Sequence, residues 1–147
     1  MIYAQEKFSD IVDEIKPLIE EHYHEIAKYK DIPLEPDWDC YKAMETLGVL
    51  KIYTCRDEVD NKLLGYGVYL VKTHLHYMSC LVAQQDILFI TKEKRGQGGR
   101  FILWCDSELK KLGVKLTVHH IKASHNFGTM LERFGYELMD LIYTRRL

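Results

Sequence analysis

Residues 88–100 read LFITKEKRGQGGR, a short apolar run that leads into a basic segment with three glycines. The apolar run is typical of a strand end, and the residues from 101 to 112 have the pattern of a helix. The first turn of a helix leaves backbone N–H groups unpaired and carries the positive end of the helix dipole, while glycine lets an anion approach the backbone closely. Arg95 and Arg100 flank the turn and add positive charge. The stretch therefore predicts a pyrophosphate cradle, with a merely tight structural connection as the alternative.

Two common phosphate-binding loops do not fit this stretch. No Gly-Lys-Ser/Thr sequence follows the glycines, so the stretch is not a Walker loop. It is not the dinucleotide fingerprint either, because it comes late in the chain and no leading βαβ unit precedes it. The pattern therefore indicates a phosphate-bearing ligand of another class.

Outward from this stretch, the sequence predicts alternating strands and helices. Apolar positions recur at three- and four-residue steps from Ser9 to Ile26, which predicts an amphipathic helix with Ser9 as its N-cap. Pro17 lies inside this segment, so we expect a kink or a division into two helices. The other predicted elements are helices over 38–47, 101–112 and 126–134, and strands over 2–5, 49–55, 64–72, 81–91, 114–121 and 136–144. This order predicts a mixed α/β domain.

The composition indicates one intracellular domain. The chain has 147 residues and a formal net charge of -2, which offers no bulk attraction to nucleic acid or to an anionic membrane. The four cysteines form no Cys-x-x-Cys pair, so we expect reduced thiols. No secretory signal is visible, and no apolar run reaches the roughly 20 residues that a membrane span needs. We expect one cytoplasmic domain over 1–147, with no membrane partner and no strong nucleic-acid signal.

The strand, the glycine turn and the helix after it resemble the acetyl-CoA-binding motif of the GNAT acyltransferase superfamily. In that family a strand ends in Arg/Gln-x-x-Gly-x-Gly/Ala and runs into a helix. Residues 126–136 are similar to the family's second landmark, an Asn-initiated helix that ends in Gly-aromatic before a strand, and the predicted element order matches over essentially the whole chain. The runs HNFG at 125–128 and LERFGYE at 131–137 also resemble uncharacterised GNAT-like proteins of bacteriophages, which implies the host cytoplasm.

The resemblance implies the GNAT fold, a mixed and mostly antiparallel central sheet with splayed parallel strands and flanking helices. It also implies acetyl-CoA as acyl donor, with strand backbone holding the pantetheine arm and loop amides holding the pyrophosphate. Two positions depart from the family's pattern: Arg100 replaces a Gly or Ala, and Leu131 replaces the tyrosine that many members use as general acid. The cofactor-binding residues implied by the resemblance are Leu88, Phe89, Ile90, Arg95, Gly96, Gln97, Gly98, Gly99, Arg100 and Asn126.

Acyl transfer to an amine benefits from a base, because a lysine-like amine with a pKa of about 10.4 is almost entirely protonated at pH 7. Asp86 is the first candidate, a lone carboxylate entering an apolar strand; a strand-start residue bonded to backbone is the alternative. His74 and His76 would point the same way in a strand, and Tyr77 could replace the missing acid. For these three, a solvated strand edge is the alternative. We assign no metal, because the sequence establishes no third ligand beside the two histidines.

His22, Glu25 and Trp38 are candidate acceptor-binding residues, because the first helices cover the acceptor side of the cleft in the resembled family. A solvated helix face and a core anchor are the alternative roles. We therefore expect an N-acetyltransferase that moves acetyl from acetyl-CoA to a primary amine by direct attack in a ternary complex. A phage-type nucleobase- or DNA-modifying enzyme and a non-catalytic CoA- or partner-binding module are the alternatives. The acceptor's identity and a homodimer stay open.

Overall fold

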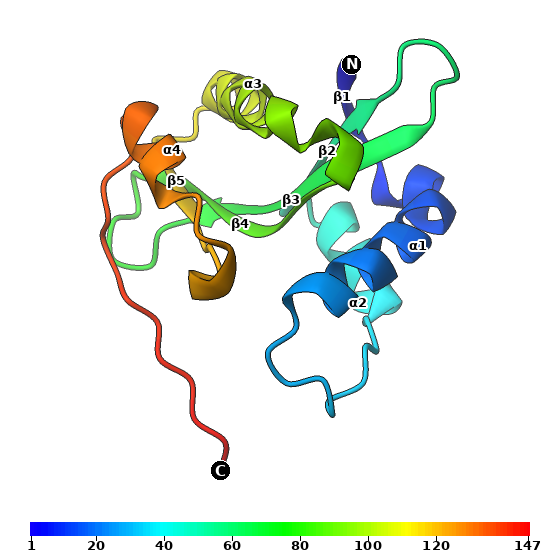
Figure 1. Ribbon diagram of the computed structural model, residues 1–147. Coiled ribbons are helices and arrows are strands. Elements are labelled where there is room, and N and C mark those ends of the chain that lie inside the picture. The colour runs from blue at the N-terminus through cyan, green and yellow to red at the C-terminus, as the bar shows by residue number, and fades with distance from the viewer.

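A single sheet of five strands runs through the molecule, and the computed structural model describes residues 1–147 (Figure 1). The strands lie in the order β1-β2-β3-β4-β5, and every neighbouring pair is antiparallel except β4 and β5, which run parallel. The predicted mixed, mostly antiparallel sheet with flanking helices is confirmed. The strand bounds are Ile2–Glu6 (β1), Leu50–Arg56 (β2), Leu63–Thr73 (β3), Leu81–Ile90 (β4) and Leu116–His119 (β5).

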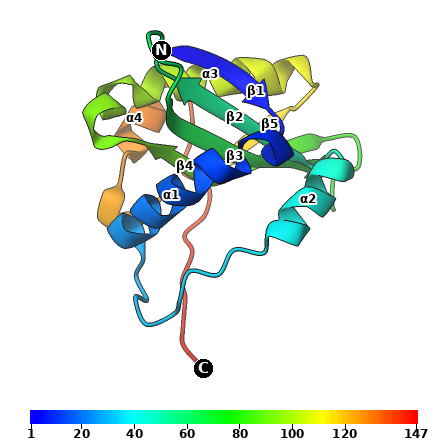
Figure 2. The same cartoon turned by 90° about the vertical axis from the view of Figure 1, so that its right-hand side faces the viewer.

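Helices cover both faces of this sheet. The helix bounds are Phe8–Ile26 (α1), Trp38–Thr46 (α2), Gly98–Lys111 (α3) and Gly128–Arg133 (α4). The helices α1 and α2 lie on one face, and α3 and α4 lie on the other (Figures 1 and 2). Ile11 of α1 belongs to a buried cluster with Val68, while Tyr69, the next residue of β3, is buried with Phe101 of α3. Because both faces are covered, β2 and β3 are nearly continuous buried runs.

The first helix begins differently from the sequence prediction. Lys7, not Ser9, is the N-cap residue, and no side chain of its own caps the helix. The Glu45 carboxylate of α2 accepts instead from the backbone N–H of Phe8 and, at 3.3 Å, from that of Ser9. This carboxylate satisfies N–H groups that a local cap would otherwise have taken, and it ties α1 to α2. Pro17 lies exposed within one unbroken helix, so the predicted division into two helices is wrong.

The predicted strand over 136–144 is absent, since no regular element follows α4. Tyr136 donates its hydroxyl to Asp106 of α3, at 2.7 and 2.8 Å from the two carboxylate oxygens. The chain then leaves the body of the protein (Figure 1). A segment with the composition of a strand forms one only when a neighbouring strand pairs with it, and no strand pairs with this segment. Its apolar side chains are therefore exposed, namely Leu138, Met139, Leu141, Ile142 and Tyr143.

The thiols agree with the sequence expectation, because all four cysteines are free. Cys55 and Cys105 are buried, Cys80 is partly buried and Cys40 is exposed. Burial raises the pKa of the Cys105 thiol, which keeps it protonated and unreactive at neutral pH. None of the helices combines the length and the hydrophobicity that crossing a membrane requires.

A substitution at Gly65 tests how closely β3 and β4 approach each other at this position. A Cβ at this position would lie 2.5 Å from the carbonyl oxygen of Phe89, a backbone atom that cannot swing away. We predict that Gly65→Ala lowers the free energy of unfolding by about 1–3 kcal/mol, the usual cost of overpacking. Gly96→Ala is the control for stability, because a Cβ there meets nothing within 4 Å. Urea denaturation followed by circular dichroism checks both, and equal stability of the two variants would contradict the prediction.

Candidate active site

A β-bulge at Asp86 is the first feature of the site. Val68 of β3 pairs with Ile87 of β4, and the next residue, Tyr69, pairs with Gln85, so Asp86 is the extra residue. A bulge bends its strand and re-aims a side chain, and bulges recur next to active sites. The parallel pairing of β4 with β5 ends at Gln85 and His119. The two strands therefore separate at the residue where the bulge bends β4.

Gln85 holds the point where the strands separate. Its side chain is buried, and its Oε1 atom accepts a hydrogen bond from the backbone N–H of His120 at 3.1 Å. This bond satisfies an amide that has no ladder partner beyond the last paired residues. Our sequence reasoning missed Gln85, although a polar residue beside Asp86 in an apolar strand was a visible signal.

Beyond the bulge, backbone groups of β4 face the opening that β5 leaves. The Thr91 N–H donates to the Leu64 carbonyl at 2.8 Å, so Thr91 belongs to a hydrogen-bonded pair with β3. Because such pairs alternate along an antiparallel ladder, the backbone groups of Leu88 and Ile90 point away from β3. Phe89 points its backbone toward β3, and we assign it a side-chain role only.

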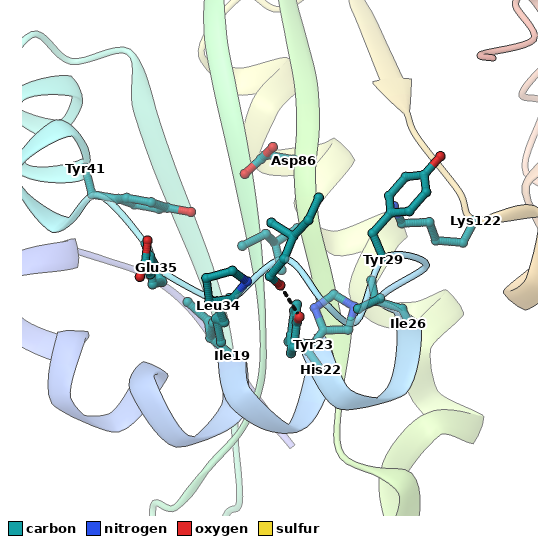
Figure 3. A pocket seen from close by; sticks show the side chains of 15 residues that line it. Ile19, His22, Tyr23, Ile26, Tyr29, Leu34, Glu35, Tyr41, Asp86 and Lys122 are labelled. Atoms are coloured by element: carbon teal, nitrogen blue, oxygen red, sulfur yellow. Dashed lines mark hydrogen bonds between the residues drawn. The ribbon is translucent and has the colours of Figure 1, made fainter. Parts of the chain in front are cut away.

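Two cavities meet at this opening. The strand cavity, of about 390 Å³, lies along β4 and under the start of α3. The loop cavity, of about 510 Å³, lies between α1 and the segment over 27–36, and Figure 3 shows its lining. Four residues line both cavities: His22, Ile26, Asp86 and Lys122. The strand cavity is also lined by Glu25, Gln85, Leu88, Phe89, Ile90, Arg95, Gly98, Ile102, His120, Ile121, His125, Phe127 and Met130. The loop cavity is also lined by Ile19, Tyr23, Ala27, Tyr29, Ile32, Pro33, Leu34, Glu35, Pro36, Tyr41 and Ile87.

Asp86 is the carboxylate at the meeting point. Its side chain is exposed, but the protein atoms around the carboxylate displace part of its solvent and raise its pKa, and the nearby His120 opposes this rise. Tyr41 projects its ring from α2 toward Asp86 across the loop cavity (Figure 3). Burial, followed by the Asp86 charge, raises the pKa of Tyr41 to about 12, so its hydroxyl is protonated at neutral pH. The sequence analysis missed Tyr41, because no pattern in the neighbouring residues shows that a residue of α2 faces Asp86, which lies 45 positions further along the chain.

His22, like Asp86, was predicted from the sequence to lie in the site, and the structure places it there. Its ring lies 5.2 Å from the ring of Phe89, centroid to centroid. Burial lowers the pKa of His22 to about 4, with Glu25 opposing the shift. The imidazole is therefore neutral at pH 7, so it is a hydrogen-bonding group and not a cation.

Arg95 connects the glycine segment to α1. Its Nη2 atom lies 2.5 Å from a carboxylate oxygen of Glu25, and its Nε donates to the Ile90 carbonyl at 3.3 Å. Arg95 is the main cause of the lowered pKa of Glu25. This bridge places a guanidinium at the rim of the strand cavity, beside the start of α3.

The glycine segment is not one loop. Residues Lys92–Gln97 form a 3-10 turn, and α3 begins at Gly98, three residues before the predicted start. Gly98 lines the strand cavity, whereas Gly99 is a packing residue, because a Cβ there would lie 2.9 Å from the ring of Phe134. Arg100 is exposed, and its charge opposes the rise in the Tyr3 pKa caused by burial. Of the predicted set, Gly96, Gln97, Gly99 and Arg100 do not line the cavity.

The structure does not bring five further sequence candidates to the cavities. His74, His76 and Tyr77 lie in the turn between β3 and β4, beyond the end of the strand, where the rings of His74 and Tyr77 lie 4.7 Å apart. Trp38 packs with Phe8 and Tyr41 as a core anchor. The Asn126 side chain accepts from the N–H of Gly128, the first residue of α4, at 2.7 Å. No group of three or more His, Cys, Asp or Glu side chains is placed to hold a metal ion.

No family model matches the chain, and no curated protein matches its sequence. Solved structures match it over nearly its whole length. A ribosomal-protein-alanine N-acetyltransferase from Brucella melitensis biovar Abortus 2308 has a TM-score of 0.69 at 17% identity, with 100% of each chain covered. An aminoglycoside acetyltransferase from an uncultured soil metagenomic sample has a TM-score of 0.74 at 12% identity, covering 99% of this chain and 95% of that one.

Glucosamine-6-phosphate N-acetyltransferase from Arabidopsis thaliana has a TM-score of 0.69 at 12% identity, with 99% of each chain covered. At such low identity, this similarity shows the fold, which is that of the GNAT acetyltransferases. The class of protein that the chain resembles in structure is therefore the acetyltransferases. The resemblance to bacteriophage proteins stays a prediction.

The neutral His22 predicts a loss of stability in mild acid. Its pKa is about 4 in the folded state and about 6.5 in the unfolded state, so the unfolded chain binds the proton more readily as the pH falls below 6.5. Between pH 7 and pH 5 this costs the folded state about 1–2 kcal/mol, allowing for the part of the ring that solvent reaches. Urea unfolding at both pH values should show a smaller difference for His22→Gln than for the unmodified protein.

The exposed neighbour His24 supplies the control for this measurement. His24→Gln should keep the full difference between pH 7 and pH 5. His119, whose pKa burial also lowers to about 4, should keep a residual difference in both variants. An unchanged difference in His22→Gln would show that folding does not lower the pKa of His22.

Proposed function

We propose that the protein transfers an acyl group, with acetyl as the simplest case, from coenzyme A to a primary amine by direct attack in a ternary complex. One observation carries the proposal: two cavities of different character meet at Asp86, where β4 and β5 separate. The strand cavity would take the acyl donor, and the loop cavity would take the acceptor. The GNAT fold of the solved acetyltransferases supports this division of roles.

The residues of the strand cavity fit an acyl-CoA. Pantetheine is a chain of methylene and amide groups, and it needs an apolar trough with hydrogen-bonding backbone beside it. Leu88 and Ile90 supply both, because their backbone groups face the opening and their side chains line it. Arg95 and the first turn of α3 would hold phosphate, and Gly96 lies in open space where a ligand can approach the backbone.

When bound, acyl-CoA supplies the activated carbonyl carbon, and its thiol is the leaving group. The amine nitrogen bonds to this carbon as the carbon–sulfur bond breaks, so the nitrogen loses a proton and the sulfur gains one. Asp86, directly or through a water molecule, takes the proton from the amine. The raised pKa of Asp86 makes it a better base than an ordinary aspartate, provided that it stays ionised at the working pH.

The second proton needs a donor on the side of the strand cavity. Leu131 stands where many GNAT members carry a tyrosine acid, and it is buried. We assign this role to His120, which lines the strand cavity and lies close enough to Asp86 to lower its pKa. The backbone N–H of Leu88 or Ile90 is placed to donate to the carbonyl oxygen as negative charge develops there.

Asp86→Asn tests the assignment of the base. The substitution keeps the shape of the side chain and removes its basicity, so we expect kcat to fall by about 100-fold or more while acetyl-CoA binding stays unchanged. Release of the free thiol of coenzyme A in the presence of an amine measures kcat, and calorimetry measures binding. Asp39→Asn is the matched control, because Asp39 is exposed on α2 and lines neither cavity.

The same two measurements separate the alternatives. Full turnover by Asp86→Asn would contradict its role as the base. Tight acetyl-CoA binding by the unmodified protein without thiol release for any amine would favour a non-catalytic binding module. Absence of acetyl-CoA binding would contradict the proposed function altogether.

A further inference from the structure

The loop cavity is built as a mainly apolar chamber. Its volume of about 510 Å³ suits a small organic molecule, and nine of its fifteen lining residues are hydrophobic. Ile19 and Ile26 come from α1, and Ile87 comes from β4. The outer wall is the segment over 27–36, which contributes Ile32 and Leu34. A ligand of this cavity gains by burying an apolar body, because there are few polar groups to bind a polar one.

Two of the three tyrosines in this cavity present rings and not hydroxyls. The Tyr23 hydroxyl donates to the Ile32 carbonyl, a bond that also holds the outer wall against α1 (Figure 3). The Tyr29 hydroxyl is bonded to Thr144 of the C-terminal segment at 3.1 Å. Since the protein already uses both groups, these side chains offer a ligand their aromatic faces. Only the Tyr41 hydroxyl remains to bind a polar atom.

The charged groups of the cavity are divided between two sides. Glu35 lies on the same side as Tyr41, and Lys122 lies on the opposite side, nearer the strand cavity (Figure 3). Neither Glu35 nor Asp86 has a protein cation within 4.0 Å. His22 adds no positive charge, because it is neutral at pH 7. Glu35 and Asp86 are solvent-exposed carboxylates that lack cationic partners and lie beside an apolar wall, so together they attract an ammonium group.

We infer that the acceptor is a small primary amine with an aromatic or branched apolar body and no anionic group. This inference rests on the proposed function and names its acceptor class. Glu35 attracts the ammonium group, which releases one proton to solvent to become the free amine. Asp86 takes the second proton as the amine attacks, and the tyrosine rings enclose the apolar body. The product is the neutral N-acyl amide, which leaves the carboxylates without a cation to hold and so favours its release.

The cavity is a poor fit for other amines. A phosphorylated amine would need several cations, and Lys122 is the only one in the lining. A polyhydroxylated amine would leave many hydroxyl groups without partners beside Ile19, Ile32 and Leu34. A linear polyamine would satisfy the carboxylates, but it would bury charged or polar nitrogens against the apolar wall.

A panel of amines tests the inference, with acetyl-CoA as donor and thiol release as readout. The amines are 2-phenylethylamine, tryptamine, ethylamine, spermidine and glucosamine 6-phosphate. We expect kcat/KM for 2-phenylethylamine to exceed that for ethylamine by at least about ten-fold, because the cavity buries the ring. Tryptamine should behave like 2-phenylethylamine, and spermidine and glucosamine 6-phosphate should be poorer substrates than either.

A variant locates the effect in the loop cavity. Glu35→Gln should raise KM for 2-phenylethylamine by about three- to ten-fold, the effect of one exposed charge, and leave the affinity for acetyl-CoA unchanged. Glu20→Gln is the matched control, because Glu20 is exposed on α1 and lines neither cavity. A change in KM of the same size in both variants would overturn the role of Glu35.

The outcomes distinguish a failure of the inferred acceptor class from a failure of the proposed acyl transfer. A preference for 2-phenylethylamine over ethylamine of less than ten-fold overturns the inference, as does better turnover of spermidine or glucosamine 6-phosphate. Either result leaves acyl transfer itself intact. Thiol release with none of the five amines overturns the inference. Acetyl-CoA binding, measured by calorimetry, then tests the proposed function separately, because absence of binding contradicts it.

Discussion

The extra residue in β4 is the constraint on which the rest of the site depends. Without the bulge at Asp86, β4 would continue straight, and its parallel pairing with β5 could extend past Gln85 and His119. The bulge gives up ladder hydrogen bonds, and the protein replaces one of them with the side chain of Gln85. The other freed backbone groups, at Leu88 and Ile90, become the polar lining of the strand cavity. One irregularity thus produces the opening, the exposed carboxylate and the hydrogen-bonding wall together.

The elements around the opening are held by a few polar contacts between segments far apart in the sequence. Glu45 of α2 accepts from the first N–H groups of α1, so the two helices on one face of the sheet are tied together. Glu25 at the other end of α1 pairs with Arg95 beside α3. Both ends of α1 are therefore attached to different neighbours, which holds His22 in place between the two cavities.

The sequence predicted the features that depend on local chemistry and missed those that depend on distant partners. Periodicity and glycine placement predicted the order of elements and the start of a helix at the glycine segment, because these signals lie within a few neighbouring residues. Asp86 was recognisable as a carboxylate out of place in an apolar strand. Tyr41, by contrast, reaches the site only because the fold brings α2 to the same cavity as Asp86 of β4. The residues over 136–144 have the composition of a strand, but no neighbouring strand is there to pair with them.

The pairing of Arg95 with Glu25 has a consequence for the order of events. A phosphate bound at the start of α3 would compete with Glu25 for the same guanidinium, so its arrival would loosen one attachment of α1. The helix α1 also lines the loop cavity, through Ile19, His22 and Ile26. Occupancy of the two cavities would then be thermodynamically linked, and by reciprocity a ligand in either one would change the affinity of the other for its own ligand. The ion pair would in this way add a second coupling to the one that the four shared lining residues already provide.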